Sequence, residues 1–382
     1  MADNNENKVL NVPHLRFPEF SGEWKKCKFG DIATGFDYGM NAAAKPFDGE
    51  NKYIRITDID EASSTYNDKD IVSPDGRLTD NYVVNDRDIL LVRTGASTGK
   101  SYLYRKSDGK LYYAGFLIRA NITEHNPYFV FSQLHTHRYW RWVSIMSARS
   151  GQPGINSQEY SSFPIFTTSL HEENKISTLL SLLNERIVTQ NKIIEKLQSL
   201  IKGIAQHCIK ESTSGNTYVK LGDICQITTG KLDANAQVDN GIYPFFTCAE
   251  QPFKIDSFAF DTEALLISGN GANLGYINYY KGKFNAYQRT YVLDLFSENI
   301  QYIKWALKVL LPKRIAIEKS SSNTPYIVLS TLTDLRLPIP CKSKQSFIAN
   351  LMQSLERKLS NQIAQYDSYN YLKQYLLRQM FI

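Results

Sequence analysis

A glycine-rich segment carries the residue types of a phosphate-binding loop: Gly95-Ala96-Ser97-Thr98-Gly99-Lys100-Ser101. The nucleotide-binding motif needs four residues between its glycines, so that the backbone amides can wrap the phosphates. Only three separate Gly95 from Gly99, which argues against a nucleotide-binding site. Two interpretations remain open: a purely structural turn, or a turn that brings backbone close to a DNA phosphate with Lys100 as a point charge.

A second segment, Asn323-Thr324-Pro325-Tyr326, resembles the Asn-Pro-Pro-Tyr motif of adenine methyltransferases. Gly269-Asn270-Gly271, followed by Asp294, also resembles the cofactor fingerprint of those enzymes. That fingerprint needs a helix directly after its glycines, whereas the sequence between Gly275 and Tyr291 indicates strand and a Lys-Gly-Lys turn. We therefore expect no catalytic residue and no bound cofactor in this chain. A stand-alone adenine DNA methyltransferase is the alternative.

Two loops rich in Gln, Asn and Ser occupy matching places in the two halves of the chain, each after a basic residue. Gln and Asn can bond adenine bidentately, and Arg can bond guanine in the same way. Turns without any contact are the alternative. The DNA-contact candidates from these loops and from the glycine-rich segments are Arg93, Thr94, Ser97, Thr98, Lys100, Arg149, Gln152, Asn156, Ser157, Asn270, Asn273, Lys319, Ser322, Asn323 and Thr324.

The sequence is duplicated internally. Lys28-Phe29-Gly30-Asp31-Ile32 matches Lys220-Leu221-Gly222-Asp223-Ile224 with an offset of 192. Leu90-Leu91-Val92-Arg93-Thr94-Gly95-Ala96 is matched to Leu265-Leu266-Ile267-Ser268-Gly269-Asn270-Gly271-Ala272 with an offset of 175. A helical set beginning at Ile176 and Ile348 has an offset of 172. The shrinking offset indicates that the second copy lacks about 20 residues, mostly in its globular part.

Composition sets broad limits. The 382 residues suffice for two domains, and a net charge of +6 is compatible with nucleic acid without demonstrating it. No apolar run reaches the roughly 18 residues of a membrane span, and the polar start is unlike a signal peptide. We expect a cytoplasmic protein with no membrane partner. Five scattered cysteines, and His135 and His137 on different faces of a predicted helix, indicate no metal site.

Two β-rich regions alternate with two long helices. Short β-type runs between turns extend from Trp24 to about Ile165 and from Tyr218 to about Pro340, and aromatic residues predict a helix after Pro127. Each region precedes an apolar seam with steps of four and three residues, typical of a coiled coil. The seams are Ile176, Leu180, Leu183, Ile187, Gln190, Ile194, Leu197, Ile201, Ile204, Cys208 and Ile348, Met352, Leu355, Leu359, Gln362, Tyr366, Tyr369, Lys373, Leu376, Met380.

The predicted fold class is α+β, with two mixed β-rich domains, two long helices pairing as an antiparallel coiled coil, and a pseudo-two-fold internal repeat. The expected boundaries are an N-terminal tail at 1–20, a first domain at 21–170, a spacer helix at 171–211, a second domain at 212–341 and a spacer helix at 342–382. A helix of about 38 residues would be roughly 57 Å long and could span at most about 17 base pairs.

Gln190 and Gln362 occupy equivalent seam positions near the middle of the two helices. In an antiparallel pair they would meet near the pseudo-two-fold axis, where a buried polar pair fixes the register. Two glutamines facing water are the alternative.

The order of β-rich domain, long helix, β-rich domain and long helix resembles the specificity subunits of type I restriction-modification systems. So do the paired Gly-Asp-Ile segments, the opening Val12-Pro13-His14-Leu15-Arg16-Phe17-Pro18-Glu19-Phe20-Ser21-Gly22-Glu23-Trp24, and the helical Glu173-Asn174-Lys175-Ile176-Ser177-Thr178-Leu179-Leu180-Ser181-Leu182-Leu183-Asn184-Glu185-Arg186-Ile187. The likeness runs from about Val12 to Ile382. The helix seams are generic, so the duplicated order and the opening motifs make it specific.

The resemblance implies two target-recognition domains, each reading one half of a bipartite, asymmetric site in double-stranded DNA. The helices would set the spacing and bind two modification subunits. Those partners would bring S-adenosylmethionine and flip the target adenine, while restriction subunits would add ATP- and Mg-dependent translocation and cleavage. A protein-only coiled-coil adaptor is a further alternative. Because the chain stops at Ile382, any closure of the second helix onto the N-terminal end is expected to come from residues 1–20.

Overall fold

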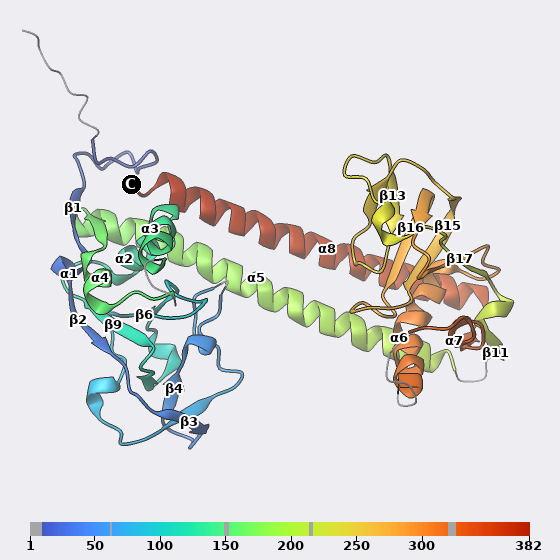
Figure 1. Ribbon diagram of the computed structural model, residues 1–382, viewed down its shortest axis with the longest axis horizontal. Coiled ribbons are helices and arrows are strands. Elements are labelled where there is room, and N and C mark those ends of the chain that lie inside the picture. Colours follow the sequence, from blue (N-terminus) through green and yellow to red (C-terminus); the bar gives the residue numbers. More distant parts are fainter. Residues whose placement is uncertain (1–9, 62, 149–152, 214–216, 320–325) are drawn as a thin grey trace, which may run out of the picture. The chain divides into compact units, whose positions relative to one another are not determined.

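The computed structural model describes residues 10–61, 63–148, 153–213, 217–319 and 326–382. The chain forms two compact units, one of Met1–Lys192 with Ala364–Ile382 and one of Ile193–Ile363 (Figure 1). Both unit boundaries fall inside long helices, α5 (Leu170–Glu211) and α8 (Lys342–Gln379). Each unit therefore contains one stretch of each long helix.

A four-stranded antiparallel sheet of order β2-β9-β6-β7 divides the first unit into two cores. Successive side chains of a strand point to opposite faces. Accordingly Ile89 and Leu91 pack with α2, α3 and α4 on one face, while Leu90 and Val92 pack with β4 and β8 on the other. The elements are β1 (Lys25–Lys28), α1 (Phe29–Ile32), β2 (Ala33–Tyr38), β3 (Ala43–Pro46), β4 (Lys52–Ile54), β5 (Val72–Asp75), β6 (Asp88–Val92), β7 (Ser101–Leu103), β8 (Leu111–Tyr113), β9 (Leu117–Ile122), α2 (Pro127–Gln133), α3 (His137–Ser147), α4 (Ser157–Ser162) and β10 (Pro164–Thr167).

The second unit has a six-stranded sheet of order β12-β17-β15-β16-β13-β14, in which only the β13–β16 pair is parallel. Leu265 and Ile267 pack with α6 on one face, and Leu266 packs with Phe246 and Phe284 on the other. The elements are β11 (Thr217–Lys220), the 3₁₀ turn η4 (Leu221–Asp223), β12 (Gln226–Thr229), β13 (Tyr243–Phe246), β14 (Phe253–Ile255), β15 (Phe260–Ser268), β16 (Ile277–Ala286), β17 (Thr290–Asp294), α6 (Ile300–Lys319), α7 (Leu329–Thr333) and β18 (Arg336–Ile339).

The internal repeat is confirmed element by element. β1 pairs with β10 as β11 pairs with β18, and the strand order β2-β9-β6-β7 matches β12-β17-β15-β16. Phe29 N donates to Phe163 O, and Leu221 N donates to Leu335 O. The helix predicted after Pro127 is α2, and the stretch after Gly275 is the strand β16, as expected.

One predicted match is wrong by one residue. Val92 N donates to Lys100 O and Ser268 N donates to Tyr276 O, so Val92 corresponds to Ser268 with an offset of 176, not 175. A slip of one residue would move every side chain of the strand to the other face of the sheet. The offset thus falls from 192 at Phe29 and Leu221 to 176 at this strand, so the second copy is 16 residues shorter between the positions of Phe29 and Val92.

The predicted seam of α5 is mostly buried and that of α8 is buried at its two ends and partly buried between them. Within each unit the two long helices run antiparallel. In the first unit the start of α5, with Ile176 and Leu180, packs against the end of α8, with Leu376 and Leu377. In the second unit the end of α5 packs against the start of α8, where Ile348 lies. The register role of Gln190 and Gln362 stays a prediction; Gln190 is buried and Gln362 is partly exposed.

Residues 10–20, predicted as part of the tail, contact both long helices inside the first unit; residues 1–9 lie outside the described ranges. Leu15 N donates to Gln379 O at the end of α8. Arg16 forms a bidentate pair with Glu172, with Nε–Oε1 and Nη2–Oε2 distances of 2.7 and 2.8 Å. The expected closure of the second helix onto this segment is therefore present.

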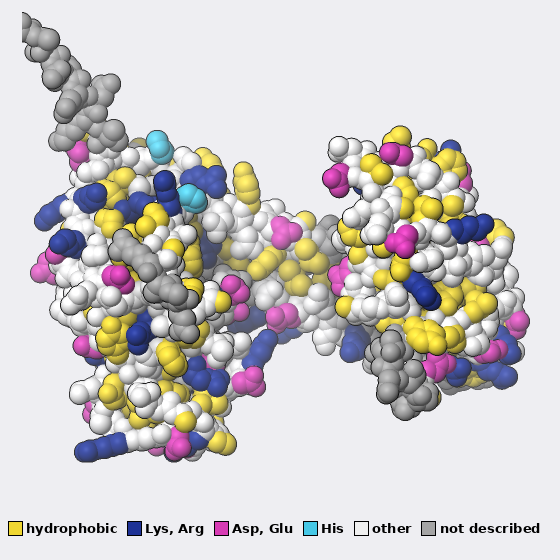
Figure 2. All heavy atoms as spheres, in the orientation of Figure 1, with side chains coloured by type: hydrophobic (Ala, Val, Ile, Leu, Met, Phe, Trp, Pro, Cys, Tyr) yellow, Lys and Arg dark blue, Asp and Glu magenta, His cyan; other side chains and the backbone are white. Residues whose placement is uncertain are grey.

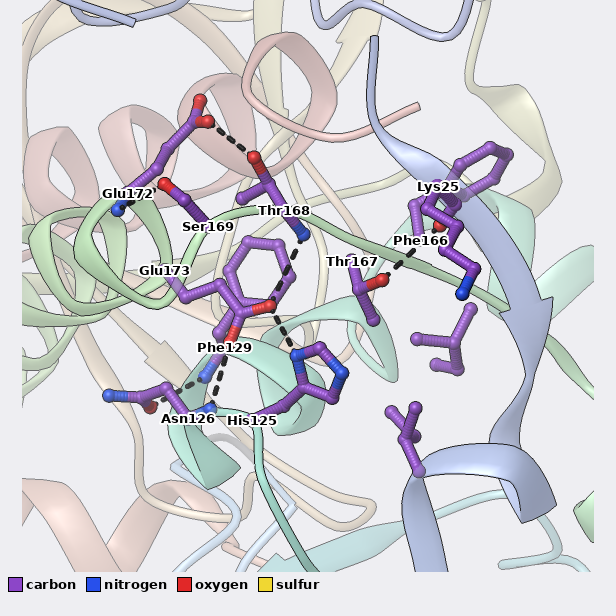
Figure 3. A network of polar contacts seen from close by, with 12 residues as sticks. Lys25, His125, Asn126, Phe129, Phe166, Thr167, Thr168, Ser169, Glu172 and Glu173 are labelled. Atoms are coloured by element: carbon purple, nitrogen blue, oxygen red, sulfur yellow. Dashed lines mark hydrogen bonds and ion pairs between the residues drawn. The ribbon is translucent and has the colours of Figure 1, made fainter.

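Glu172 and Glu173 do more than complement the dipole of α5, because both carboxylates are buried. Burial would raise the pKa of Glu172, but hydrogen bonds from Arg16 and Thr168 and the charge of Arg16 hold it below its usual value. Glu173 accepts from Asn126 N at 2.9 Å and contacts His125 Nδ1 at 2.8 Å (Figure 3). This network fastens the first turn of α5 to the segment that precedes α2.

The second unit repeats this connection with an amide in place of the carboxylate. Gln345, in the first turn of α8, accepts from Asn299 N at 3.0 Å. Asn299 caps α6 by accepting from Gln301 N and Tyr302 N, as Asn126 caps α2. The same backbone amide is therefore held in both copies.

His135 lies between α2 and α3 with both ring nitrogens in contact with polar groups. Nδ1 is 2.8 Å from Phe131 O, and Nε2 is 3.0 Å from Ser64 Oγ. The carbonyl can only accept, so a neutral ring protonated on Nδ1 satisfies both contacts. Burial, together with the charge of Lys373, lowers the pKa of His135 to about 4.

We predict that His135 makes the first unit acid-sensitive. Between pH 6.5, the ordinary pKa of histidine, and about pH 4, His135 is protonated in the unfolded chain and neutral in the folded chain. The free energy of unfolding therefore falls by up to about 1.4 kcal/mol for each pH unit of acidification over that range. His135→Asn should lose less stability over that window in urea unfolding. His14→Asn, at an exposed position, is the control. Equal pH profiles for His135→Asn and the unaltered chain would contradict the assignment.

Candidate nucleic-acid interface

A glycine turn follows the central strand of each sheet. In the first unit Gly99 N donates to Val92 O at 3.0 Å, and in the second Gly275 N donates to Ser268 O at 2.8 Å. The φ angles are 79° at Gly95 and Gly271, and 94° and 82° at Gly99 and Gly275. These left-handed values favour glycine, which explains why the same glycine spacing occurs in both copies.

The turn in the first unit borders an open concavity of about 870 Å³. Its walls come from the end of β2, the segment after β4, the glycine turn and the β8–β9 connection. Arg93 lines it, with its guanidinium carbon 4.7 Å from the centre of the Tyr38 ring. Hydrogen bonding from Ser157, and further the charge of Arg93, lower the pKa of the Tyr38 hydroxyl. Phe116 is strongly exposed on the same lining.

The turn in the second unit borders a concavity of about 700 Å³ at the equivalent place. Thr229 ends β12 as Tyr38 ends β2, and both residues line their concavity. Asn270, Gln288 and Arg289 supply polar groups, and Gln288 and Arg289 are exposed. The two copies therefore share a hollow in the fold but line it with different side chains.

The structure brings together three of the predicted contact residues in the first unit, because Arg93, Thr94 and Ser97 all line its concavity. Thr98 is buried, and its hydroxyl donates to Gly95 O at 2.7 Å, so it supports the turn. Lys100 forms an ion pair with Glu61 at 3.4 Å.

The closing loop of the first unit continues into α4. Asn156 caps this helix by accepting from Glu159 N, and Ser157 N donates to the Tyr38 hydroxyl at 3.3 Å.

In the second unit Asn270 accepts from Cys248 Sγ and lines the concavity. Asn273 donates to Cys248 O at 3.0 Å and so ties the turn to its neighbour. Lys319 is the last residue of α6. The remaining predicted contacts lie outside the described residues: Arg149, Gln152, Ser322, Asn323 and Thr324.

Several lining residues were missed by sequence reasoning because they come from segments distant along the chain. Tyr38 at the end of β2, Arg55 just after β4 and Phe116 just before β9 line the first concavity. Arg289, in the β16–β17 turn, lines the second. Their only sequence signal was the position of Phe116 and Arg289 just before strands. Arg55 is held in a bidentate pair with Asp58.

Charge is dispersed over the surface. On the face drawn in Figure 2, lysine and arginine side chains are spread over both units among acidic and uncharged ones. Among the residues that the structure describes, no group of His, Cys, Asp and Glu side chains could hold a metal ion. Within the same ranges, no helix combines the length and the apolar character that crossing a bilayer requires.

Comparison with known proteins agrees with this duplicated architecture. Residues 213–366 match the family model described as the type I restriction modification DNA specificity domain. The first unit repeats the strand order of this matched region, so the chain combines two domains of one backbone frame with two long helices. The chain therefore resembles the specificity subunits of type I restriction-modification systems over the matched region.

Two curated relatives are similar over part of their length. The type I restriction enzyme EcoDI specificity subunit of Escherichia coli is 44% identical over 137 residues, which are 36% of this chain and 30% of that protein. A putative type I specificity subunit of Mycoplasma genitalium is 23% identical over 238 residues, 56% of this chain and 61% of that protein. In these alignments the chain spans about a third and about three fifths of the two relatives.

Solved structures share the fold. The crystal structure of a type I restriction-modification S subunit from M. genitalium superposes with a TM-score of 0.69 at 17% identity, covering 97% of this chain and 99% of that one. A chain from a study of complex assembly and conformational transition in a type I system gives a TM-score of 0.57 at 16% identity, with the same coverage.

We predict that the two glycine turns respond alike to a methyl group. Gly95→Ala and Gly271→Ala meet no atom within 4 Å, so the left-handed backbone alone should destabilise each variant, by about 1–2 kcal/mol. Gly203→Ala, in α5 and equally open, is the matched control and should stabilise by about 0.5–1 kcal/mol. Chemical unfolding of the full chain measures all three. A loss as large for Gly203→Ala as for the turn variants would refute the conformational explanation.

Proposed function

We propose that this chain is the non-catalytic, DNA-reading specificity subunit of a type I restriction-modification complex. Each unit reads one half of a bipartite, asymmetric site in double-stranded DNA. The main support for this proposal is the pair of equivalent concavities beside the glycine turns. Their backbone frame is repeated, whereas their side-chain linings differ, with Tyr38 in one unit where the other has Thr229.

Two half-sites of different base sequence require different side chains on a common backbone frame. Base edges are read by hydrogen bonds from a few side chains, while contacts to phosphates position the protein. A shared frame would approach the two half-sites in the same way. The side chains at its rim, such as Tyr38 and Phe116 in one unit and Thr229 and Arg289 in the other, would then select different bases.

Two modification subunits are the proposed protein partners, with S-adenosylmethionine bound to them and ATP and Mg used by restriction subunits. Supporting this, Leu200 and Leu372 are 53% and 43% exposed and lie 172 residues apart, so they are equivalent positions of the repeat. One lies in each unit. A repeated apolar position on the long helices suits two copies of one partner, and a cytoplasmic location follows from the proposed substrate.

Selection from a randomised duplex pool, using the full chain with its modification subunits, tests the proposal. We expect enrichment of one bipartite asymmetric sequence, and a linear fall of log affinity with log salt of slope roughly −0.9 per phosphate contacted. The isolated chain should transfer no methyl group. Enrichment of no sequence, or methyl transfer by the chain alone, would contradict the proposal.

Exchange of one domain tests modularity. Replacing residues 24–165 with the same region of another specificity subunit should change one half-site and leave the other unchanged, because the second unit keeps its own concavity. Sequencing of methylated adenines in cells carrying the chimaera reads both halves at once. A change in both half-sites would rule out independent reading.

A further inference from the structure

The rim of each concavity contains one backbone pair that is identical in the two units. In the first unit Arg93 N donates to Phe116 O at 3.1 Å, and Ile155 N donates to Arg93 O at 2.9 Å. In the second unit Gly269 N donates to Arg289 O at 2.8 Å, and Ile327 N donates to Gly269 O at 2.9 Å. Arg93 therefore corresponds to Gly269, and Phe116 corresponds to Arg289.

Each pair thus contains one arginine, but the arginine occupies the first position of the pair in one unit and the second position in the other. The first unit has it after the central strand β6, and the second has it before β17. All four residues line their concavities.

Steric crowding explains the exchange in the second unit. A Cβ atom at Gly269 would come within 2.5 Å of Arg289 O and 3.1 Å of the Tyr291 ring. No arginine fits there without moving backbone. The partner position at Arg289 is exposed and open to the concavity, so a guanidinium can enter the hollow from that side.

Both guanidinium groups are available to a ligand. Arg16, Arg55 and Arg119 are held by carboxylates in the first unit, whereas within the described ranges no ion pair involves Arg93 or Arg289. Arg93 Nε is buried and has no hydrogen-bond partner among the described residues. The Arg93 guanidinium carbon lies over the Tyr38 ring, 4.7 Å from its centre, and the planar guanidinium suits a planar, bidentate acceptor.

We propose that Arg93 and Arg289 each read one guanine, Arg93 in the half-site of the first unit and Arg289 in that of the second. The O6 and N7 acceptors of guanine match the two parallel donors of a guanidinium in the major groove. This inference rests on the proposed function and adds the base and the residues that recognise it. Each half-site accordingly contains one guanine that depends on one arginine.

The test uses the full chain with its modification subunits and the randomised duplex pool, comparing the unaltered chain with Arg93→Lys and Arg289→Lys. Lysine keeps the charge but loses the bidentate fork. We expect Arg93→Lys to lose roughly tenfold to hundredfold preference for guanine at one position of the first half-site only. Arg289→Lys should do the same in the second half-site only. Arg141→Lys and Arg336→Lys, at exposed positions, are the matched controls.

Different outcomes separate the two levels of the proposal. If the unaltered chain selects no sequence, the proposed function itself fails. If it selects a bipartite site but both lysine variants keep every base preference, the guanine assignment is overturned. The guanine assignment also fails if the variants weaken binding to all sequences equally, since that marks phosphate contacts. Thermal unfolding of each variant shows whether misfolding causes the loss. Arg93→Gln and Arg289→Gln are second variants, which should also lose the preference for guanine.

Discussion

A buried acceptor in the first turn of each long helix fastens that helix to the domain that precedes it in the chain. Glu173 of α5 and Gln345 of α8 each hold the backbone amide of an asparagine that caps a helix of the preceding domain, α2 or α6. That helix covers one face of the sheet, and the sheet ends at the glycine turn beside the concavity. Burying a carboxylate or an amide is unfavourable unless it is hydrogen-bonded. These hydrogen bonds therefore fix the orientation of the long helix relative to the capped helix, the sheet and the concavity of the same unit.

Much of this architecture can be predicted from local patterns in the amino-acid sequence. The heptad seams, the strand-type runs and the repeated Gly-Asp-Ile segments predicted two β-rich domains and two long helices, because each pattern depends on neighbours along the chain. The strand match at Val92 was wrong by one residue because apolar residues fill β6 on both faces, so the sequence lacks the alternation that fixes register. The concavity at Tyr38 and Phe116 was missed because its walls meet only after folding.

The two copies show what duplication preserves. The backbone hydrogen bonds that Val92 and Gly99 make in the first turn recur at Ser268 and Gly275 in the second. By contrast, Gln345 stands where the first copy has the carboxylate of Glu173, and the arginine of the rim follows β6 in one unit and precedes β17 in the other. Constraints on φ and on the sheet register act on the backbone and allow little substitution. Side chains that face a hollow have no such constraint, so the reading surfaces can diverge while the frame that positions them stays the same.

The division of the long helices between units has a consequence for synthesis of the chain. The second unit is one continuous stretch, Ile193–Ile363, but the first also needs Ala364–Ile382, which include Leu377 and Phe381 of its core. A chain emerging from the ribosome supplies its N-terminal residues first. The domain made first thus stays incomplete until the whole second unit has been translated, and Trp24, Ile176 and Leu180 wait for apolar partners that emerge only after it.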